Sequence, residues 1–506
     1  MKKRAKILTV TLFAVILVTL VFVSARALES ATERRVLHQY LSDALSPVAP
    51  HFSSVGWEPA TRALVRPFTE YDEYRVGRAI SMAWQAHASA MTTGHTDILP
   101  DYFSGVALQR AGISARQAVE DGTQMVILRQ TARPEMFHLD GSVLQVRSDA
   151  LVVRYATEGD RLTYFGMGED RTVTTLMNET TGWRVFSHER VDVAPIQTDL
   201  TGSDIPEMAG LNYYPAETPW RGFWPEFDAD LVRADLEKIA ELGANSVRFF
   251  LPRADFLDPE ISAGNIAKLE TFLRSAEDLG LHTIPTLFDL RPGYAPGTWA
   301  EDVRYLETVL PVLQASPSVV LVDLKNEPDL DYPAHGTATV EAWLRTMIAV
   351  IRQDAPDLPL TIGWSAASHG GTLVDLLDVV SYHDYAPLEG AAARLDEVRE
   401  LSGGKRVIVT EIGESSWSVA ASFPGSEAAQ ATRLGDRIEA LQDADGIFVW
   451  TLHDFADPDA SVVGASPWVR GLQSGFGLLA DGDREKPAAE TVRTLFKAWL
   501  SQGATN

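Results

Sequence analysis

Two glutamates follow apolar segments that have the length and composition of buried strands. Glu327 comes three residues after the end of the run 319–324, within the sequence Asn-Glu-Pro, and Glu411 ends the run 407–411. Cleavage of a glycosidic bond needs two such groups, one that protonates the leaving oxygen and one that attacks or supports the oxocarbenium-like centre. A single glutamate at a strand end is as often a salt-bridge partner. Two such glutamates, one of them within Asn-Glu-Pro, favour a catalytic pair that acts on the same glycosidic bond.

The elements that must position these glutamates alternate short apolar runs with amphipathic helices from residue 208 onward, which is typical of parallel βαβ units. Helical faces end at Gly243 and Gly280, each directly before an apolar run. The pattern predicts an α/β fold, a (β/α)8 barrel over 208–506 with its active site at the carboxyl ends of the strands. An open doubly wound sheet is the rival, but the turn at 212–215 lacks the glycines of a nucleotide-binding turn. The eight predicted strands are 208–214, 246–251, 282–288, 319–324, 360–364, 379–383, 407–411 and 447–452.

At these residues the chain resembles glycoside hydrolase clan A, most nearly the family 5 cellulase and mannanase-like group. The segment 326–328 is similar to the acid/base motif of the clan, and 410–413 is similar to its nucleophile strand. The resemblance implies retaining hydrolysis of a β-linked polysaccharide or oligosaccharide, with Glu327 as acid/base and Glu411 as nucleophile. The chain differs from family 5 at Asp289, since those enzymes often carry a histidine at the end of the third strand.

The resemblance also implies roles for residues at other strand ends. Arg248 resembles an arginine that keeps the nucleophile ionised, and His383 with Tyr385 resembles a pair near substrate and nucleophile. Trp450 resembles the platform beneath the sugar at the cleavage point. Asn326 is expected to help hold the sugar's 2-hydroxyl group or the nucleophile in place.

Three further residues are candidates for substrate binding because they fall at or just beyond predicted strand ends. Trp364 and Trp417 offer flat aromatic faces that suit the C–H surfaces of pyranose rings, and Asp289 offers a carboxylate on the same rim. We further expect partial burial to raise the pKa of Glu327, so that its carboxyl group can donate a proton near neutral pH.

No metal or cofactor is expected. The eleven histidines lack the spacing of a zinc motif, no phosphate-binding glycine loop occurs, and the aspartates after Glu327 lack the remainder of a calcium loop.

Composition limits the partners and the number of folded units. A chain of 506 residues, 45% of them hydrophobic, can form more than one core. Its net charge of −25 argues against nucleic acid as a ligand, because phosphate binding needs clustered lysine and arginine. The absence of cysteine excludes disulfides, thiolate catalysis and cysteine-ligated metals.

The first 29 residues predict a signal-anchor or transmembrane segment. Four basic residues within the first six precede an uncharged run at 7–24, which as a helix would rise about 27 Å, close to the thickness of a bilayer's hydrocarbon core. The basic end is expected to stay inside, which places the remaining chain outside the cytoplasm. The sequence Ala25-Arg26-Ala27 suits signal peptidase, so secretion after a cut near Ala27 stays open as the alternative.

Residues 30–193 predict an α+β domain in which helical periodicity precedes strand-like alternation. The predicted strands are 144–156, 161–167, 172–177 and 183–191. The arrangement loosely resembles the nuclear transport factor 2-like (NTF2-like) cone, which favours a spacer, binding or self-association role over an enzymatic one. The polar, punctuated segment 194–207 predicts a linker to the barrel.

Two other functions stay open beside hydrolysis. A transglycosylase would use the same two glutamates with an acceptor sugar in place of water, and a catalytically silent barrel would bind glycan in the cell envelope. The sugar and the choice between internal and terminal cleavage are not fixed by any motif.

Overall fold

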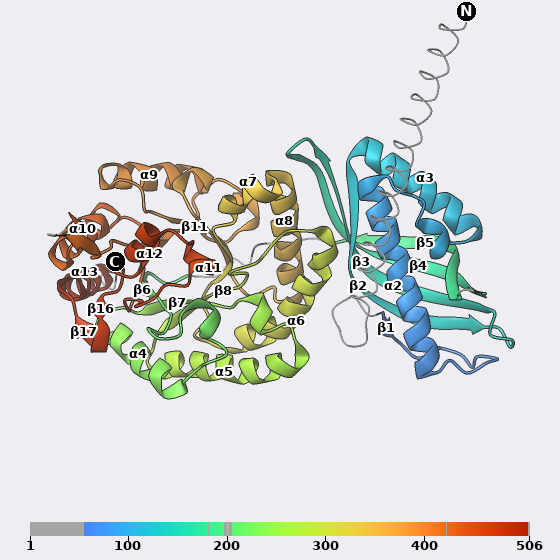
Figure 1. Ribbon diagram of the computed structural model, residues 1–506, viewed down its shortest axis with the longest axis horizontal. Coiled ribbons are helices and arrows are strands. Elements are labelled where there is room, and N and C mark those ends of the chain that lie inside the picture. The colour runs from blue at the N-terminus through green and yellow to red at the C-terminus, as the bar shows by residue number, and fades with distance from the viewer. Residues whose placement is uncertain (1–54, 181, 197–199, 201–204, 421–422, 504–506) are drawn as a thin grey trace, which may run out of the picture. The chain divides into compact units, whose positions relative to one another are not determined.

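The computed structural model describes residues 55–180, 182–196, 200, 205–420 and 423–503 (Figure 1). They divide into two compact units, one made of residues up to Ala156 with Gly168–Ala194, the other of Thr157–Met167 and the residues from Pro195 on. The predicted membrane segment at 7–24 lies outside the described residues. Among those that are described, no helix combines the length and hydropathy needed to cross a membrane.

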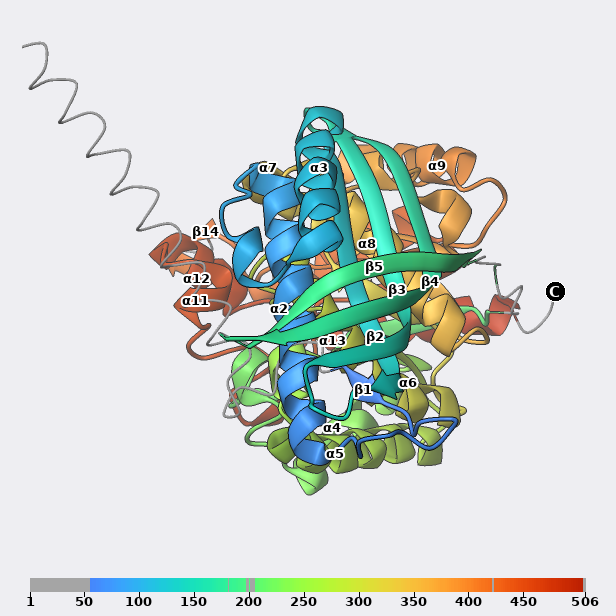
Figure 2. The same ribbon diagram turned by 90° about the vertical axis from the view of Figure 1, so that its right-hand side faces the viewer.

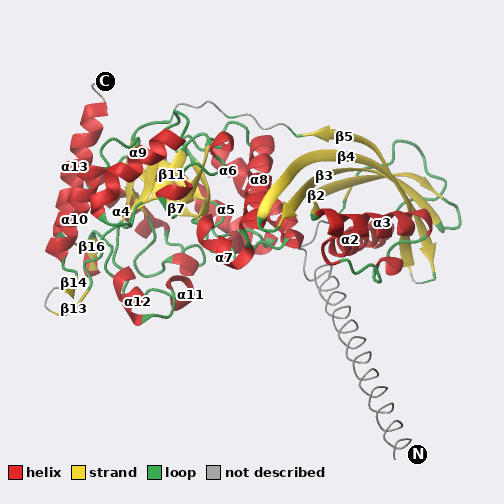
Figure 3. Cartoon of the chain, turned by 90° about the horizontal axis from the view of Figure 1, so that it is seen from above, coloured by secondary structure: helices red, strands yellow, loops and turns green. Residues whose placement is uncertain are grey.

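The first unit is a five-stranded sheet with two helices (Figures 2 and 3). Its strands, in spatial order, are β1 (Gly56–Trp57), β2 (Thr123–Phe137), β3 (Val143–Glu158), β4 (Arg161–Glu179) and β5 (Gly182–Pro195). The helices α2 (Glu70–Thr93) and α3 (Gly105–Asp121) pack on each other and on β2. The sequence pattern did not predict β2, and the segments predicted at 161–167 and 172–177 form the single strand β4.

Helix α2 is defined at both ends by capping residues. The Thr69 side chain accepts from the Asp72 backbone N–H while the Asp72 carboxylate accepts from the Thr69 N–H, a reciprocal capping box. Gly94 ends the helix in the left-handed conformation, with a φ of 75°. Val76 and Ile80 are buried on the inner face, as the 3.6-residue periodicity requires.

The inner face of α2 also carries a buried histidine that has no hydrogen-bond partner. His87 is 8% exposed, and neither ring nitrogen bonds to any group in the described part of the chain. Burial lowers the pKa of His87 to about 4, and burial followed by the charge of Arg190 lowers the pKa of His188 to about 4. Both imidazoles are therefore neutral in the folded unit at pH 7.

We expect this unit to lose stability as the pH falls from about 6.5 to about 4. In that window the unfolded chain binds protons that the folded unit does not, so each histidine contributes a loss of up to about 3 kcal/mol. The substitution His87→Phe should reduce this pH dependence, because phenylalanine cannot take up a proton and the site already contains Phe103, 6.1 Å from the imidazole centroid. Urea unfolding of the full chain at pH 7, 5.5 and 4.5 tests this. If the free energy of unfolding of the variant falls with pH as steeply as that of the wild type, the prediction is wrong.

The second unit is a closed barrel of parallel strands, which confirms the predicted (β/α)8 architecture. Around the barrel the strands are β6 (Met208–Asn212), β7 (Ser246–Phe250), β8 (His282–Thr286), β9 (Val322–Asn326), β10 (Leu360–Trp364), β11 (Val380–His383), β12 (Val407–Ile412) and β15 (Gly446–Val449). The longer helices outside it are α4 (Ala229–Glu241), α5 (Pro259–Asp278), α6 (Trp299–Ala315), α8 (Thr337–Asp354), α9 (Ala391–Leu401), α10 (Glu427–Ala440) and α13 (Pro487–Gly503). Between β10 and β11 the described chain forms 3-10 turns instead of an α-helix.

The sequence pattern located the strands well and their ends less well. Strand β10 has the predicted bounds, whereas β9 begins at Val322, three residues after the apolar run begins, and continues to Asn326. The hydrophobicity of Val319 and Leu321 reflects burial, since both lie in the core before the strand begins. Apolar composition therefore marks buried chain, while the hydrogen-bonded ladder decides where the strand lies.

Candidate active site

Glu327 and Glu411 lie at the carboxyl ends of β9 and β12. Glu327 immediately follows β9 in a left-handed backbone conformation, with a φ of 48°, and its N–H donates to the carbonyl of Gly363 at 2.8 Å. A non-glycine residue in this region is strained, and such strain persists where surrounding structure imposes it. Pro328 then begins a 3-10 turn, so the chain bends sharply at the glutamate.

The two carboxyl groups meet in one pocket. An oxygen of Glu327 and an oxygen of Glu411 lie within 4.8 Å of each other, and both residues line a cavity of about 380 Å³. Retaining glycosidases separate their carboxyl groups by about 5 to 5.5 Å, while inverting enzymes need about 6.5 to 9.5 Å to admit a water molecule. An approach to within 4.8 Å is shorter than the range of the inverting enzymes.

Arg248 on β7 forms a buried ion pair with Glu411. Its guanidinium is fully buried and donates to Glu411 Oε1 at 2.7 Å, to Asp323 Oδ2 at 2.7 Å and to Asn326 Oδ1 at 2.8 Å. The Tyr385 hydroxyl donates to the other carboxylate oxygen of Glu411 at 3.0 Å. Burial works against the charged arginine, but the charges of Asp323 and Glu411 outweigh it and raise the pKa of Arg248.

Two residues that support Arg248 were not among the sequence candidates. Asp323 lies inside β9 and is fully buried, and Asn212 at the end of β6 accepts from Arg248 at 2.8 Å. Asn212 also donates to the carbonyl of Thr410, beside the nucleophile, at 2.9 Å. A charged residue within an otherwise apolar strand was the available signal for Asp323, because a buried charge needs a partner.

His383 on β11 forms a pair with Glu327. Its Nδ1 lies 2.8 Å from Glu327 Oε1 and 3.6 Å from Glu411 Oε2. Burial alone would lower the pKa of His383 and raise that of Glu327. The hydrogen bond between them and the neighbouring charges outweigh burial, so the pKa of His383 is raised and that of Glu327 is lowered. The prediction of a raised pKa at Glu327 is therefore wrong for this arrangement.

The proton needed for general acid catalysis can still come from this pair. Moving one proton from His383 to Glu327 produces the acid form without changing the total charge, so the pair titrates as a unit. We expect its apparent pKa, which is above the 6.5 of an ordinary histidine because the His383 pKa is raised, to set the basic limb of the kcat/KM profile.

The substitution His383→Asn tests this assignment. Asparagine cannot hold the proton, so the basic limb should move to lower pH and kcat/KM at pH 7 should fall by about tenfold or more. The control is His369→Asn, which alters a histidine that stacks on Trp364 and does not line the cavity. A basic limb that stays in place in the His383 variant would assign that limb to another group.

Four of the predicted substrate-binding residues line the cavity with the glutamates: Asn326, Asp289, Tyr385 and Trp450. Arg248 and His383 lie behind this lining and act through the glutamates. Two predictions need correction. Trp364 is fully buried and stacks on His369, and Trp417 packs edge-on against Trp468 at 5.2 Å, so neither lines the cavity.

Eight further lining residues were not among the predicted site residues. They are Tyr214, Trp220, Phe250, Leu290, Val462, Val463, Gln473 and Phe476. Most are apolar or aromatic, as expected for a small-molecule site, and a strand-end position was the signal for Tyr214 and Phe250.

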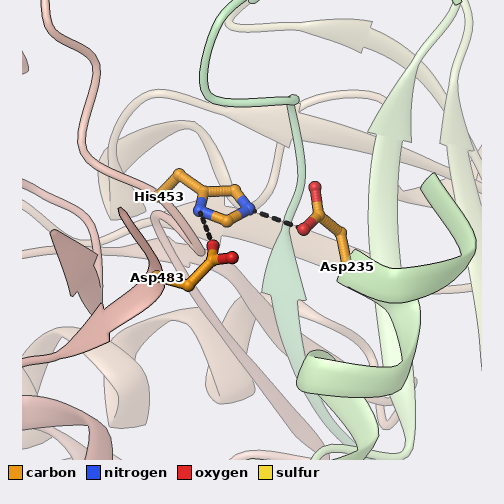
Figure 4. Close-up of side chains that lie close together, drawn as sticks. All are labelled: Asp235, His453 and Asp483. Carbon is orange, nitrogen blue, oxygen red and sulfur yellow. Dashed lines mark ion pairs between the residues drawn. The ribbon is translucent and has the colours of Figure 1, made fainter. Parts of the chain in front are cut away.

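Two groups of side chains in the described part of the chain have ligand atoms close enough to hold a metal ion. One is Glu327, His383 and Glu411, and the other is Asp235, His453 and Asp483 (Figure 4). In the second group, Lys238 Nζ lies 3.0 Å from Asp235 and 2.8 Å from Asp483, so a cation already pairs with both carboxylates. That group is better explained as an ion-pair network that joins α4 to the chain after β15.

Comparison with known proteins gives a likeness in fold. No family model and no curated protein matches the chain. A solved GH5_18 structure from Streptomyces cattleya, in complex with GlcNAc, covers 59% of this chain and 82% of its own, at 21% identity and a TM-score of 0.51. An exo-β-1,4-mannosidase from Opitutaceae bacterium strain TAV5 covers 59% of this chain and 60% of its own, at 23% identity and a TM-score of 0.48. The barrel is thus similar in fold to that GH5_18 structure, as the motifs predicted.

Proposed function

We propose that this protein is a retaining glycoside hydrolase that cleaves β-linked oligosaccharide or polysaccharide. The observation that carries the proposal is the approach of Glu327 and Glu411 to within 4.8 Å in one cavity. The likeness in fold to family 5 structures agrees with it. Arg248 and Tyr385 prepare Glu411 to act as an ionised nucleophile, while the His383–Glu327 pair supplies and later accepts a proton.

The reaction proceeds by two displacements. Glu411 attacks the anomeric carbon, the bond to the leaving oxygen breaks, and Glu327 transfers its proton to that oxygen, which leaves a glycosyl ester on Glu411. Glu327, now ionised, then takes a proton from water as the water oxygen attacks the anomeric carbon. Glu411 departs as a carboxylate, and the two inversions retain the configuration of the sugar.

Covalent labelling tests this mechanism. A 2-deoxy-2-fluoro-β-glycoside with a dinitrophenolate leaving group should form a stable ester on Glu411, identified by mass spectrometry of the digested protein. The Glu327→Gln variant should still be labelled, because this leaving group needs no acid, and the Glu411→Gln variant should not. If none of a panel of such sugars labels either the wild type or the Glu327 variant, the silent glycan-binding function is favoured.

Transglycosylation differs only in the acceptor and would give the same label. Mass analysis of products at high substrate concentration separates the two: free sugar indicates hydrolysis, and products longer than the substrate indicate transfer. We favour hydrolysis because in the described structure the cavity is partly open and lined by polar groups that admit water.

The location outside the cytoplasm is part of the proposal and rests on the sequence of the first 29 residues. We propose a single-pass anchor at 7–24 with the barrel on the outer side. Membrane fractionation with protease treatment of intact cells tests it, and amino-terminal sequencing of the mature protein distinguishes an anchor from a cut near Ala27.

We also propose that the first unit is an NTF2-like domain with a spacer, binding or self-association role. Its support is the pair α2 and α3 on one face of a curved five-stranded sheet (Figure 3). Sedimentation of the soluble chain, residues 30–506, tests self-association.

A further inference from the structure

The cavity is lined from nearly all around the rim of the barrel. Its lining comes from the carboxyl ends of seven of the eight strands: Asn326 ends β9, Tyr385 follows β11, and the others include Trp450 after β15 and Asp289 after β8. The segment after β10 contributes no lining residue among those described. The β10 side is therefore where the remainder of a bound glycan can leave.

The enclosed sugar is the one that Glu411 attacks. Strand β15 pairs with β12, the backbone N–H of Trp450 donates to the carbonyl of Ile412 at 2.8 Å, and Trp450 and Glu411 line the same cavity. The proposed reaction requires a sugar ring in this cavity to bring its anomeric carbon to Glu411 and its glycosidic oxygen to Glu327. The remainder of the chain, on the leaving-group side, then lies outside the enclosure.

A segment between β15 and β16 (Leu479–Ala480) closes the far side of this enclosure. It contains the short helices α11 (Ala460–Val463) and α12 (Pro467–Gln473), which pack together (Figure 3). Val462 and Val463 of α11 and Gln473 of α12 line the cavity. A longer glycan would have to pass through the position of the two valine side chains to extend in that direction.

The enclosure has the size and polarity of a site for one sugar. Its volume of about 380 Å³ is near the lower limit of small-molecule pockets, which span roughly 300 to 1,000 Å³. Asp289 accepts from the Tyr214 hydroxyl at 2.8 Å, and its carboxyl group lines the cavity, where its oxygens are hydrogen-bond acceptors for a sugar hydroxyl. No described group donates to the Gln473 side-chain oxygen, so that amide can turn to meet another hydroxyl.

We infer that the cavity accepts a single terminal sugar, so that the enzyme removes residues one at a time from the non-reducing end of a β-linked glycan. The end is the non-reducing one because the enclosed sugar donates its anomeric carbon to Glu411, while the leaving part keeps the reducing end. This inference rests on the proposed glycosidase function. It adds which end of the glycan is cleaved and how many sugars each cleavage releases.

The experiment has two stages that separate the two claims. A panel of aryl β-glycosides, gluco-, manno-, xylo- and galacto-configured, first identifies the sugar that the wild type cleaves and Glu411→Gln does not. Failure of the whole panel, or equal activity in the variant, overturns the proposed function and the inference with it. A homotetrasaccharide of the identified sugar, fluorescent at its reducing end, then tests the inference alone.

Cleavage at the terminal sugar gives labelled trisaccharide as the first product, together with free monosaccharide. Labelled disaccharide or monosaccharide among the earliest products indicates internal cleavage and overturns the inference, while the glycosidase function stands. Polymer viscosity gives a second reading, since terminal cleavage lowers it only slightly for each bond broken.

The double substitution Val462→Ala and Val463→Ala tests whether α11 forms a wall of the cavity. Removing four methyl groups opens the closed side, so the fraction of disaccharide among early released products should rise at least about threefold. The control is Val469→Ala, an exposed valine of α12 that does not line the cavity. An unchanged product ratio in the double variant, or an equal change in the control, would contradict the role of α11 as a wall.

Discussion

Replacing Glu411 with glutamine is expected to lower kcat by about 10⁴-fold or more while the protein remains folded. Glutamine has the same shape, and its oxygen can still accept from Arg248 while its NH2 group can donate to the Tyr385 hydroxyl oxygen, but its amide is not a competent nucleophile. The measurement is kcat for an aryl β-glycoside, together with the melting temperature of each protein. Because the lost interaction concerns the reacting atom, KM should change much less than kcat.

The matched control is Glu414→Gln, three residues further along the chain. Glu414 pairs with Arg433 and Arg437 and does not line the cavity. This variant should keep activity within about twofold of the wild type, with at most a modest loss of stability. Full activity in the Glu411 variant, or an equal loss in both variants, would remove Glu411 from the nucleophile role.

Replacing Arg248 with methionine should affect stability and catalysis together. The guanidinium is fully buried between two carboxylates, and removing it leaves Asp323 and Glu411 buried without a countercharge. We expect a loss of about 3 to 5 kcal/mol in the free energy of unfolding. The loss of the hydrogen bond to Glu411 Oε1 should also lower kcat/KM by about tenfold or more, because the nucleophile is no longer held in place.

A second buried arginine separates these two effects. Arg352 is 6% exposed and pairs with Asp378 at 2.6 Å, away from the cavity. Arg352→Met should lower the free energy of unfolding in urea while leaving the kcat/KM of the folded protein nearly unchanged. A kcat/KM that stays at the wild-type level in the Arg248 variant would show that the arginine supports the fold but does not position the nucleophile.

The barrel could be predicted from sequence because its strands are short, apolar and regularly separated by helices. The first unit was harder. Strand β2 consists mainly of buried and half-buried residues, but Arg129, Arg133 and Pro134 interrupt its apolar residues, so its composition does not resemble that of a strand. Its place in the sheet comes from pairing with β3 along nearly its whole length, and pairing between strands is not encoded in local periodicity.

The catalytic pair could also be predicted, because both glutamates follow strands whose ends must meet at one rim. The aromatic residues could not be sorted in the same way. Trp364 and Trp450 both occur at strand ends, yet Trp364 is packed against His369 and Trp450 faces the cavity. The side of the strand end that an aromatic ring occupies depends on the neighbouring loops. The α11–α12 segment contains no motif that predicts its position.

The pKa of Glu327 was mispredicted for a related reason. Burial of a carboxyl group can be anticipated from its place at a strand end, and burial does raise its pKa. The hydrogen bond from His383 depends on the register between β9, β10 and β11, which brings residues 56 positions apart to 2.8 Å. The net direction follows from that contact, and a single sequence does not reveal it.

At residue 327 the left-handed backbone conformation and the catalytic role favour different amino acids. Asparagine adopts this conformation more readily than glutamate, so a mutation that relaxes the backbone would be tolerated by the fold and would abolish proton transfer. Natural drift towards stability at this position therefore leads to an inactive protein. A descendant of this chain that had lost its enzymatic role would be expected to change at residue 327 early, while the buried arginine cluster beneath it persisted.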